Sequence, residues 1–317
     1  MSEPLAAAHP LPPEVAGPRR FRIGVVGAGR VGAVLAAGLR AAGHEVVAAA
    51  GESDASRGRM ADLLPGVVND KPSAVARGCD LLLLTVPDDM LGNVVSVLAD
   101  SGALHEGQYV VHSSGLHGLE ILAPATAVGA RAIALHPAMT FTGTAVDLDR
   151  LSGCVFGLTA EPAERECAAA LVADLGGRAM WVPENRRALY HAGLAHGANH
   201  LVTLVTEAME LLAAAGADDP AATLRPLLTA ALDNALDHGD AALTGPIVRG
   251  DVNTVRAHLD GILAEAPTTL STYLALARAT LSRAVVDGRL TAMRALKMNE
   301  VLDSAEARRP LRVRRIG

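Results

Sequence analysis

Hydrophobic residues in the first part of the chain fall into two alternating kinds of segment. Short, nearly continuous apolar runs are typical of strands buried on both faces of a parallel sheet, and longer segments with a helical period separate them. The runs predict strands at 21–27, 44–50, 79–86, 108–114, 130–136, 154–159 and 179–183. Helices are expected between them, most clearly at 30–43, where Gly43 can end the helix, and at about 161–175.

The pattern changes after Pro183. No further strand is expected, and the remaining apolar positions predict helices at roughly 184–215, 219–238, 251–265, 267–287 and 290–307. Alternating strands and helices followed by helices alone indicate an α/β protein in which a second, helical part follows the sheet. We therefore expect an N-terminal doubly wound parallel (Rossmann) sheet and a C-terminal all-helical domain.

The same pattern divides the chain into four segments. Residues 1–20 are rich in Pro and Ala without a period, so a disordered tail is expected there. The sheet domain is predicted at 21–183 and the helical domain at 184–307. The end of the chain, 308–317, is a short basic tail.

Composition narrows the classes of function. Half of the residues are hydrophobic but only 2% are aromatic, so the core is expected to consist of Ala, Leu and Val. The formal net charge of −6 argues against a nucleic-acid partner, because nucleic-acid binding requires a basic surface. No apolar run reaches about 18 residues, so no membrane span is expected, and the N-terminus does not resemble a secretory signal. Three separated cysteines fit the reducing cytoplasm.

The first predicted turn carries a glycine motif. The sequence GVVGAGRVG places Gly27, Gly29 and Gly32 in G-x-G-x-x-G spacing between the first strand and the first helix. In that context the first glycine permits a tight turn, the second lets the backbone approach a pyrophosphate, and the third lets helix and strand pack closely. The alternative is a glycine-rich turn without a ligand. The motif predicts a dinucleotide site made of Gly27, Ala28, Gly29, Arg30, Val31 and Gly32.

The segment after the second strand, GESDASRGR, bears on the type of dinucleotide. Glu52 is placed like the acid that binds the ribose hydroxyls of NAD. Ser53, Ser56 and Arg57, with Arg59 beyond them, can instead surround a 2′-phosphate, which arginine binds well. The sequence favours NADP, with NAD as the alternative, and an ordinary solvated turn is the explanation without a ligand.

Two further strand ends are expected at the same edge of the sheet. In LTVPDDM, Val86 and Pro87 follow a buried strand, and contact with the cofactor is predicted for both. In HSSG, Ser113, Ser114 and Gly115 form a cradle of hydroxyls and amides suited to a substrate carboxylate, although plain helix capping by the serines also explains them.

A histidine ends the next strand. In ALHPAMTFTG, His136 stands before Pro137 at the predicted cofactor edge. Because histidine titrates near neutrality, it can exchange the proton that accompanies hydride transfer at a carbonyl. The alternative is a structural histidine at a strand end.

The stretch YHAGLAHGANH, residues 190–200, begins the helical part. At about 100° per residue, His191, Asn199 and His196 form one polar stripe, whereas His191 and His200 point in opposite directions. Three histidines therefore cannot bind one metal ion from this helix, and no metal site is predicted. The stripe can face the cofactor, with His196 and Asn199 in catalysis and His191 in substrate binding. Histidines of the core or of a subunit interface are the alternative.

These motifs resemble those of a known superfamily. FRIGVVGAGRVG, LLTVPDD, HSSG and HPAMTFTG followed by a helical half are similar to 6-phosphogluconate, 3-hydroxyisobutyrate and prephenate dehydrogenases, ketopantoate reductase and pyrroline-5-carboxylate reductase. The narrower match, carried by ALHPAMTFTGTAVDL, YHAGLAHGANHLVTLV and DNALDHGDAALTGPIVRGD, is to Rossmann-like proteins with a C-terminal domain of unknown function 2520. That resemblance spans residues 21 to about 290.

The resemblance implies roles for several residues. The His-Pro segment of prephenate dehydrogenases assists hydride transfer, which supports His136. The Ser-Gly segment of hydroxyisobutyrate dehydrogenases holds a substrate carboxylate, which supports Ser114 and its neighbours. Related reductases place a lysine four residues before the helix asparagine, but here Ala195 precedes Asn199. A histidine would then have to move the proton.

Two functions of different classes follow from the sequence. The first is an NADP-dependent reductase or dehydrogenase that acts on a small oxo- or hydroxy-carboxylate and is similar to ketopantoate reductase. The second is a catalytically inactive NAD(P)-binding sensor or scaffold, which the missing lysine favours. Ala- and Leu-rich helices after residue 200 favour a homodimer, with a monomer core as the alternative.

Overall fold

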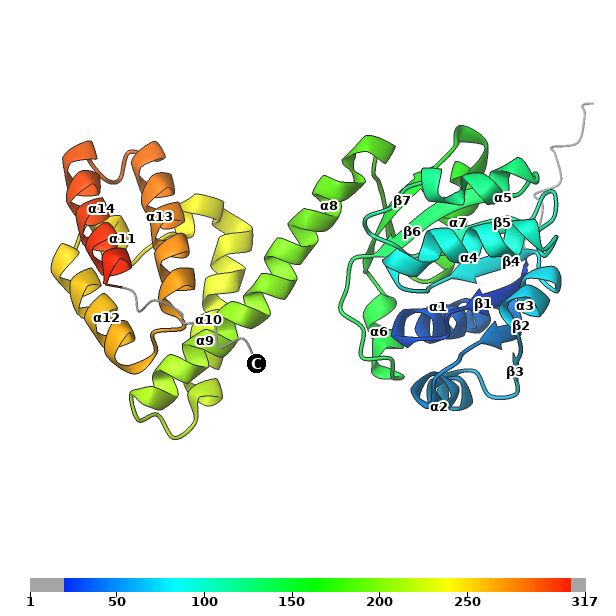
Figure 1. Cartoon of the computed structure of the whole chain (residues 1–317), viewed down its shortest axis with the longest axis horizontal. Helices are drawn as coiled ribbons and strands as arrows, with labels where there is room; N and C mark the ends of the chain where they lie inside the picture. The colour runs from blue at the N-terminus through cyan, green and yellow to red at the C-terminus, as the bar shows by residue number, and fades with distance from the viewer. Residues whose placement is uncertain (1–19, 309–317) are drawn as a thin grey trace, which may run out of the picture. The chain divides into compact units, whose positions relative to one another are not determined.

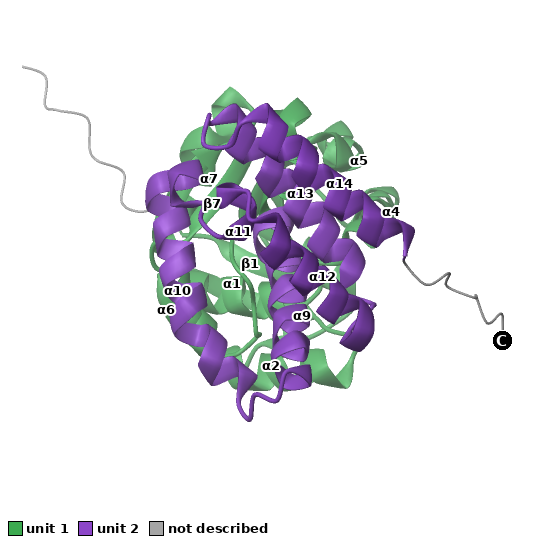
Figure 2. Cartoon of the chain, turned by 90° about the vertical axis from the view of Figure 1, so that its left-hand side faces the viewer, with its two compact units in different colours: residues 1–194 green, residues 195–317 purple. Residues whose placement is uncertain are grey.

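The computed structural model describes residues 20–308 of the chain. The predicted tails, 1–20 and 308–317, lie outside the described residues apart from Arg20 and Arg308. The chain forms two compact units, residues 1–194 and 195–317 (Figure 2). Each is described by itself below.

Unit 1 is built on one eight-stranded sheet with the order β3-β2-β1-β4-β5-β6-β7-β8 (Figure 1). Every neighbouring pair is parallel except β6 and β7, so β7 and β8 run opposite to the other six strands. The strands are β1 Arg22–Val26, β2 Glu45–Ala50, β3 Val68–Asn69, β4 Leu81–Leu84, β5 Tyr109–His112, β6 Arg131–Pro137, β7 Val155–Ala160 and β8 Arg178–Trp181.

The predicted fold class is confirmed, with two corrections to the sheet. The all-parallel sheet was wrong in one pairing, because β6 and β7 are antiparallel, with His136 opposite Gly157. Strand β3 was not predicted, since it has only two residues and both are exposed. An apolar run gives no direction to a strand, so the reversal of β7 left no signal in the hydrophobic pattern.

Helices cover both faces of this sheet, as in a doubly wound fold. The helices of unit 1 are α1 Arg30–Ala41, α2 Asp54–Leu63, α3 Pro72–Arg77, α4 Asp88–Asp100, α5 Ala123–Ala127, α6 Val146–Leu151, α7 Arg165–Asp174 and α8 Arg187–Leu194. Three 3-10 turns, Glu120–Leu122, Pro162–Glu164 and Glu184–Arg186, precede α5, α7 and α8.

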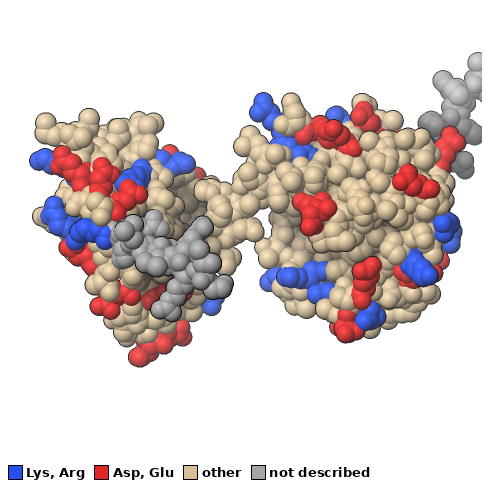
Figure 3. Space-filling model, in the orientation of Figure 1, with Lys and Arg blue, Asp and Glu red and all other residues tan. Residues whose placement is uncertain are grey.

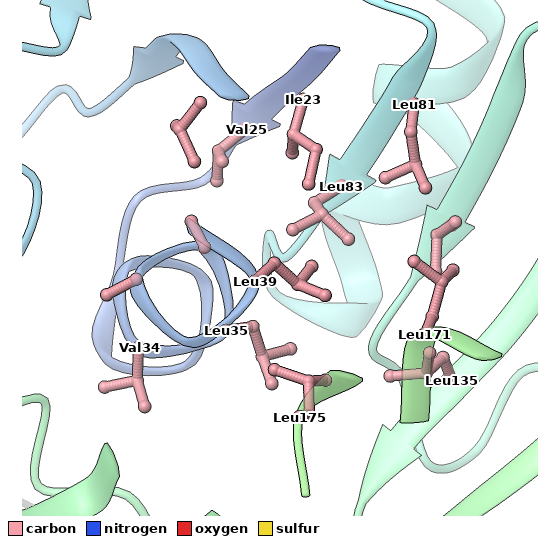
Figure 4. Close-up of a cluster of buried hydrophobic side chains, with 14 of the residues drawn as sticks. Ile23, Val25, Val34, Leu35, Leu39, Leu81, Leu83, Leu135, Leu171 and Leu175 are labelled. Carbon is pink, nitrogen blue, oxygen red and sulfur yellow. The ribbon is translucent and has the colours of Figure 1, made fainter. Parts of the chain in front are cut away.

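The two faces hold separate apolar cores, because alternate strand residues point to opposite sides. On one face, Leu35 and Leu39 of α1 pack against Ile23, Val25 and Leu83, as Figure 4 shows. The same core extends to Leu171 and Leu175 near α7. On the other face, the next residues of the same strands pack against α3, α4 and α5. The continuous apolar runs of the central strands follow from burial on both sides.

Unit 2 is entirely helical within its described residues. It contains a π-turn at Ala195–Asn199, α9 His200–Ala214, α10 Pro220–His238, a 3-10 turn at Gly239–Ala242, α11 Pro246–Arg249, α12 Val252–Glu265, α13 Leu270–Val286 and α14 Ala292–Ala307. Helices α11 to α14 enclose a core of Leu, Val, Ala and Met. Among the helices described, none is both long and apolar enough to cross a membrane.

Two details of the helical half differ from the sequence prediction. The single helix expected over 184–215 is interrupted by the π-turn, and the short helix α11 was not predicted. The compact units divide between Leu194 and Ala195, and α8 packs on the sheet of unit 1 through the buried side chain of Arg187. The domain boundary near Pro183 stays a prediction. Acidic and basic side chains are interspersed on the face of each unit shown in Figure 3.

Gly32 offers a test of the close contact between β1, α1 and the end of β4. A Cβ atom on Gly32 would collide with the Thr85 hydroxyl and lie 2.6 Å from the Gly27 carbonyl oxygen. We expect Gly32→Ala to lower the free energy of unfolding by about 1–3 kcal/mol in urea titrations. The control is Gly58→Ala in α2, where a Cβ meets no atom within 4 Å. This control should raise stability by up to ~1 kcal/mol, and equal effects of the two substitutions would contradict the proposed contact.

Candidate functional site

The glycine turn links β1 to α1 as the motif predicted. Gly27 has a φ of +94°, a conformation that suits glycine, and its amide donates to the Ala50 carbonyl at 3.1 Å. The Ala28 amide donates to the same carbonyl at 3.0 Å, and the Thr85 hydroxyl donates to the Gly27 carbonyl at 2.7 Å. The turn is therefore fixed to β2 on one side and to the end of β4 on the other.

The second and third glycines of the motif have different surroundings. Gly32 is surrounded, as described above, whereas a Cβ on Gly29 would meet only the Gly27 carbonyl oxygen, at 3.8 Å. Gly29 is also the residue before α1, and its position provides no side-chain cap for the helix. The first amides of α1, which begins with Arg30 and Val31, thus have no side-chain acceptor, and the helix dipole favours an anion there. This open, uncapped helix start fits a pyrophosphate.

The loop after β2 is more constrained than the sequence indicated. Ser53 caps α2, accepting from the Ser56 amide at 3.1 Å, and the two serine hydroxyls are 2.9 Å apart. Arg57 is bound to Asp54 and to the Glu52 carbonyl oxygen. Ser53, Ser56 and Arg57 are therefore grouped, but each already has a local partner.

Two other arginines converge beside this loop. A Cβ on Gly143 would lie 2.7 Å from Cγ of Arg30 and 2.8 Å from Nε of Arg59, so both side chains run against this glycine. The buried carboxylate of Asp147 holds the same segment by accepting from the Thr142 and Gly143 amides, each at 2.7 Å. Burial alone would raise the pKa of Asp147, but these amides outweigh it and keep the pKa below its ordinary value. Arg30 of α1 and Arg59 of α2 therefore both lie against this fixed loop.

Val86 and Pro87 lie at the end of β4, next to the glycine turn. A Cβ on Gly27 would be 2.7 Å from the Val86 amide nitrogen, so the backbone of Val86 lies against the glycine turn. Val86 is half-buried and Pro87 is exposed immediately before α4.

The HSSG segment forms a hydrogen-bonded turn after β5. The Ser114 hydroxyl accepts from the Leu116 and His117 amides at 3.2 and 3.1 Å, and the residue is only 6% exposed. His112, fully buried, accepts from the Ser114 amide and donates to the Gly118 carbonyl at 2.7 Å. Burial lowers the pKa of His112 to about 3, so the ring is neutral. Ser113 remains half-buried at the strand end.

His136, at the end of β6, lies in a cluster with residues of α8 and of the HSSG turn. Its Nδ1 is 2.8 Å from the Tyr190 hydroxyl, and its ring meets that of His191 edge to face with centroids 5.8 Å apart. A Cβ on Gly115 would lie 3.0 Å from Nε2 of His136 and 2.6 Å from Cδ2 of His191. Position 115 therefore requires glycine, because the two histidines occupy the space that a side chain would take.

Burial and neighbouring charge set the protonation state of His136. Burial lowers its pKa to about 4, and the positive charge of Arg187 and the adjacent His191 act in the same direction. His136 is therefore a neutral imidazole at physiological pH. Neutral histidine can accept a proton at one ring nitrogen and donate a hydrogen bond from the other.

Arg187, the first residue of α8, ties this cluster to the sheet. The guanidinium is 1% exposed and donates to the Ser114 carbonyl at 2.5 Å, the Gly157 carbonyl at 3.3 Å and the Thr159 hydroxyl at 3.1 Å. Burial lowers its pKa, although arginine remains charged in proteins. The side chain thus fixes the ends of β5 and β7 relative to α8.

His196 and Asn199 belong to unit 2, on the π-turn, and both are exposed. His196 and His200 point at each other, with Nδ1 atoms 3.0 Å apart. The structure brings together the unit 1 residues His136, His191, Ser114 and Gly115, whereas the roles of His196 and Asn199 stay predictions. In residues 20–308 no three His, Cys, Asp or Glu side chains are grouped so as to hold a metal ion.

Two family models match successive parts of the chain. One describes a Rossmann-like domain and matches residues 10–137. The other describes the domain of unknown function DUF2520 and matches residues 154–280. The chain therefore carries a Rossmann-like domain followed by a DUF2520 domain. The resemblance read from the sequence is thereby confirmed, and the DUF2520 match begins within the sheet, at Cys154 just before β7.

Solved structures share the fold of this DUF2520 protein. A candidate NADP oxidoreductase from Bacteroides fragilis is 19% identical with a TM-score of 0.72, covering 83% of this chain and 98% of that one. Protein TM1727 from Thermotoga maritima is 19% identical, with a TM-score of 0.58 and coverage of 90% and 99%. A 1-pyrroline-5-carboxylate reductase from Streptococcus pyogenes is 17% identical, with a TM-score of 0.55 and coverage of 91% and 99%. No curated protein matches the chain.

Three residues of the site were missed by the sequence analysis. Tyr190 is adjacent to the predicted His191, and its spacing from His136 along the chain gave no hint of contact. His112 and Arg187 looked like an ordinary strand residue and an ordinary helix charge. The sequence held part of the signal, because glycine at positions 115 and 157 leaves the space that the large side chains of this site occupy.

The two neutral histidines predict acid sensitivity. In the folded DUF2520 protein the pKa values of His112 and His136 are about 3 and about 4, below the 6.5 of a free imidazole. The unfolded chain therefore binds protons first as the pH falls, so the full stability is present above pH 6.5 and is lost as the pH falls toward 4. We expect a loss on the order of 1.4 kcal/mol per pH unit for each histidine.

Urea unfolding at several pH values measures this loss. The transition midpoint should fall as the pH is lowered from 6.5, and His136→Gln should make the fall less steep. A midpoint that stays constant down to about pH 5 would show that these imidazoles are not buried in the neutral form.

Proposed function

We propose that this DUF2520 protein is an NADP-dependent oxidoreductase that exchanges a hydride with a small oxo- or hydroxy-carboxylate. One observation carries the proposal: unit 1 combines an uncapped helix start behind Gly29 with a neutral histidine, His136, at the end of a strand of the same sheet. The first feature suits a dinucleotide and the second suits proton exchange at a carbonyl. The NADP named for the Bacteroides fragilis protein of the same fold supports the choice of cofactor.

The residues present fit a nicotinamide dinucleotide. The amides of Arg30 and Val31 would bind the pyrophosphate, and Gly29 leaves space for its close approach. Arg30 and Arg59 would bind a 2′-phosphate, which favours NADP over NAD. The cofactor, when bound, supplies or accepts the hydride.

The substrate end of the site is formed by the HSSG turn and His136. Ser113 and the Gly115 amide would hold a carboxylate, with His191 beside them, and His136 would contact the reacting oxygen. Ketopantoate is the first oxo acid to test, because the sequence resembles ketopantoate reductases. For His196 and Asn199, which belong to unit 2, a role in catalysis stays a prediction from the sequence.

Gly29→Ala tests NADPH binding separately from folding stability. Among the described residues the added Cβ meets no atom closer than 3.8 Å, so the free energy of unfolding should change by less than about 0.5 kcal/mol. The same methyl group occupies the space proposed for the pyrophosphate, so NADPH affinity should fall about tenfold or more in calorimetric titration. Unchanged NADPH affinity would place the dinucleotide elsewhere.

Arg59→Ala tests the coenzyme preference. If Arg59 binds the 2′-phosphate, its removal should weaken NADPH about tenfold and leave NADH within about twofold. Arg57→Ala is the matched comparison, because Arg57 already has Asp54 as its partner. A selective loss with Arg57→Ala instead would move the phosphate to the Ser53–Arg57 side of the loop.

Turnover decides between an enzyme and a binding protein. NADPH consumption with a panel of small 2-oxo acids, ketopantoate included, should be detected and should drop about 100-fold or more in His136→Gln. NADPH binding without turnover of any panel member would favour the sensor or scaffold, which Ala195 in place of a lysine also favours.

Helices α9 and α10 lead us to propose a homodimer. None of the 15 residues of α9 is buried, although most are apolar, and α10 buries only Leu224. Val202 on α9 and Leu227 on α10 are 67% and 65% exposed. Apolar side chains on two neighbouring helices are suited to a second copy of the chain.

Sedimentation of charged variants tests this assembly. Val202→Asp and Leu227→Asp together should convert a dimer into a monomer, whereas Val286→Asp, at an exposed position of α13, should not. A wild-type chain that sediments as a monomer would refute the proposal.

A further inference from the structure

Tyr190 connects α8 with the antiparallel pair β6 and β7. Its hydroxyl oxygen is 2.8 Å from Nδ1 of His136, and the two rings meet edge to face with centroids 5.6 Å apart. The residue opposite His136 in the sheet is Gly157, where a Cβ would lie 2.5 Å from Cζ and 2.6 Å from the hydroxyl oxygen of Tyr190. The lack of a side chain at Gly157 therefore makes room for the tyrosine beside the histidine.

The hydrogen between Tyr190 and His136 can be assigned from the partners of each group. Burial raises the pKa of Tyr190, so its hydroxyl keeps its one hydrogen. The backbone of Gly157 acts on this pKa in the opposite direction, but burial outweighs it. The hydroxyl therefore has a hydrogen to donate, and Nδ1 of His136 lies 2.8 Å from its oxygen.

A histidine that accepts at Nδ1 and is neutral carries its hydrogen on Nε2. Nε2 faces Gly115, because a Cβ there would be 3.0 Å away. Arg187 lies close enough to oppose a second proton on the ring, and His191 flanks the other side of Gly115. The ring therefore presents an N–H group, rather than a lone pair, to the end of the HSSG turn.

We infer that Tyr190 is a positioning residue that holds His136 as the neutral imidazole with its hydrogen on Nε2, and that this N–H donates to the carbonyl oxygen of the substrate. The consequence for substrate rests on the proposed function, but the tautomer does not. An Nε2–H group polarises a carbonyl, so the site is arranged for an oxo acid. After hydride reaches the carbonyl carbon, the oxygen would take the Nε2 hydrogen while Nδ1 takes the hydroxyl hydrogen of Tyr190, which solvent then restores. A lone pair at Nε2 would instead suit removal of a proton from a hydroxy acid.

Nitrogen NMR of the full chain labelled with ¹⁵N-histidine reads the tautomer directly. The His136 signals are assigned by their loss in His136→Gln. In the wild type the hydrogen-bearing nitrogen should be Nε2 and the unprotonated nitrogen Nδ1. In Tyr190→Phe the donor to Nδ1 is lost, so both tautomers become populated and the two nitrogen shifts move toward each other.

A second histidine–tyrosine pair provides the matched control. In unit 2, Nδ1 of His258 is 3.0 Å from the Tyr273 hydroxyl, again edge to face. Tyr273→Phe should alter the signals of His258 and leave those of His136 unchanged. Gly157→Ala, which forces Tyr190 away, should reproduce the His136 change seen in Tyr190→Phe, with a thermal melt to show that each variant is folded.

Each outcome bears on a separate statement. A hydrogen on Nδ1 of His136 in the wild type, or an identical His136 spectrum in Tyr190→Phe, overturns the inference. If an oxo acid is turned over, kcat should fall about tenfold or more in Tyr190→Phe with NADPH affinity unchanged. If no oxo acid is turned over but the Nε2 tautomer is found, the proposed function fails and the role of Tyr190 as a positioning residue stands.

Discussion

The buried guanidinium of Arg187 is the interaction on which the arrangement of the site depends. Removing a cation from water is costly, and no carboxylate of residues 20–308 is bonded to this one. Two carbonyl oxygens and one hydroxyl offset the loss of hydration. Those three acceptors come from the turn after β5 and from β7, so a single charge fixes both relative to α8. Tyr190 and His191 follow on the same helix, and their approach to His136 depends on these three hydrogen bonds of Arg187.

Small residues complement that charge. Gly32 admits Thr85, Gly115 admits His136 and His191, and Gly157 admits Tyr190. In each case a large or polar side chain occupies the space that a Cβ would take, so the glycine and its neighbour form one unit. Gly29 is different, because the nearest described atom to an added Cβ is the Gly27 carbonyl oxygen, 3.8 Å away. The contrast separates the glycines that serve packing from Gly29, which has open space at the proposed dinucleotide site.

Much of the fold followed from the hydrophobic pattern, and less of the site did. Continuous apolar runs such as Leu81–Leu84 predicted buried strands, and the glycine spacing predicted the β1–α1 turn, because both depend on local chemistry. The direction of β7 did not follow, since an apolar run reads the same either way. Contacts between His136 and Tyr190, 54 positions apart, arise only once the sheet is assembled. The partners of Ser53 and Arg57 could not be predicted either, because the residue types are the same whether these side chains bind a phosphate or their own neighbours.

The reversal of β7 has a consequence for the rim of the sheet. Since β6 and β7 are antiparallel, the chain between Pro137 and Val155 does not cross to the far end but remains where β6 finishes. This stretch, anchored by Asp147, becomes a wall beside the helix start, with Gly143 against Arg30. A wall made of connecting loop can change in length and chemistry without altering the order of the strands. Changes in this loop can therefore alter what binds at this edge of the sheet while the sheet itself stays the same.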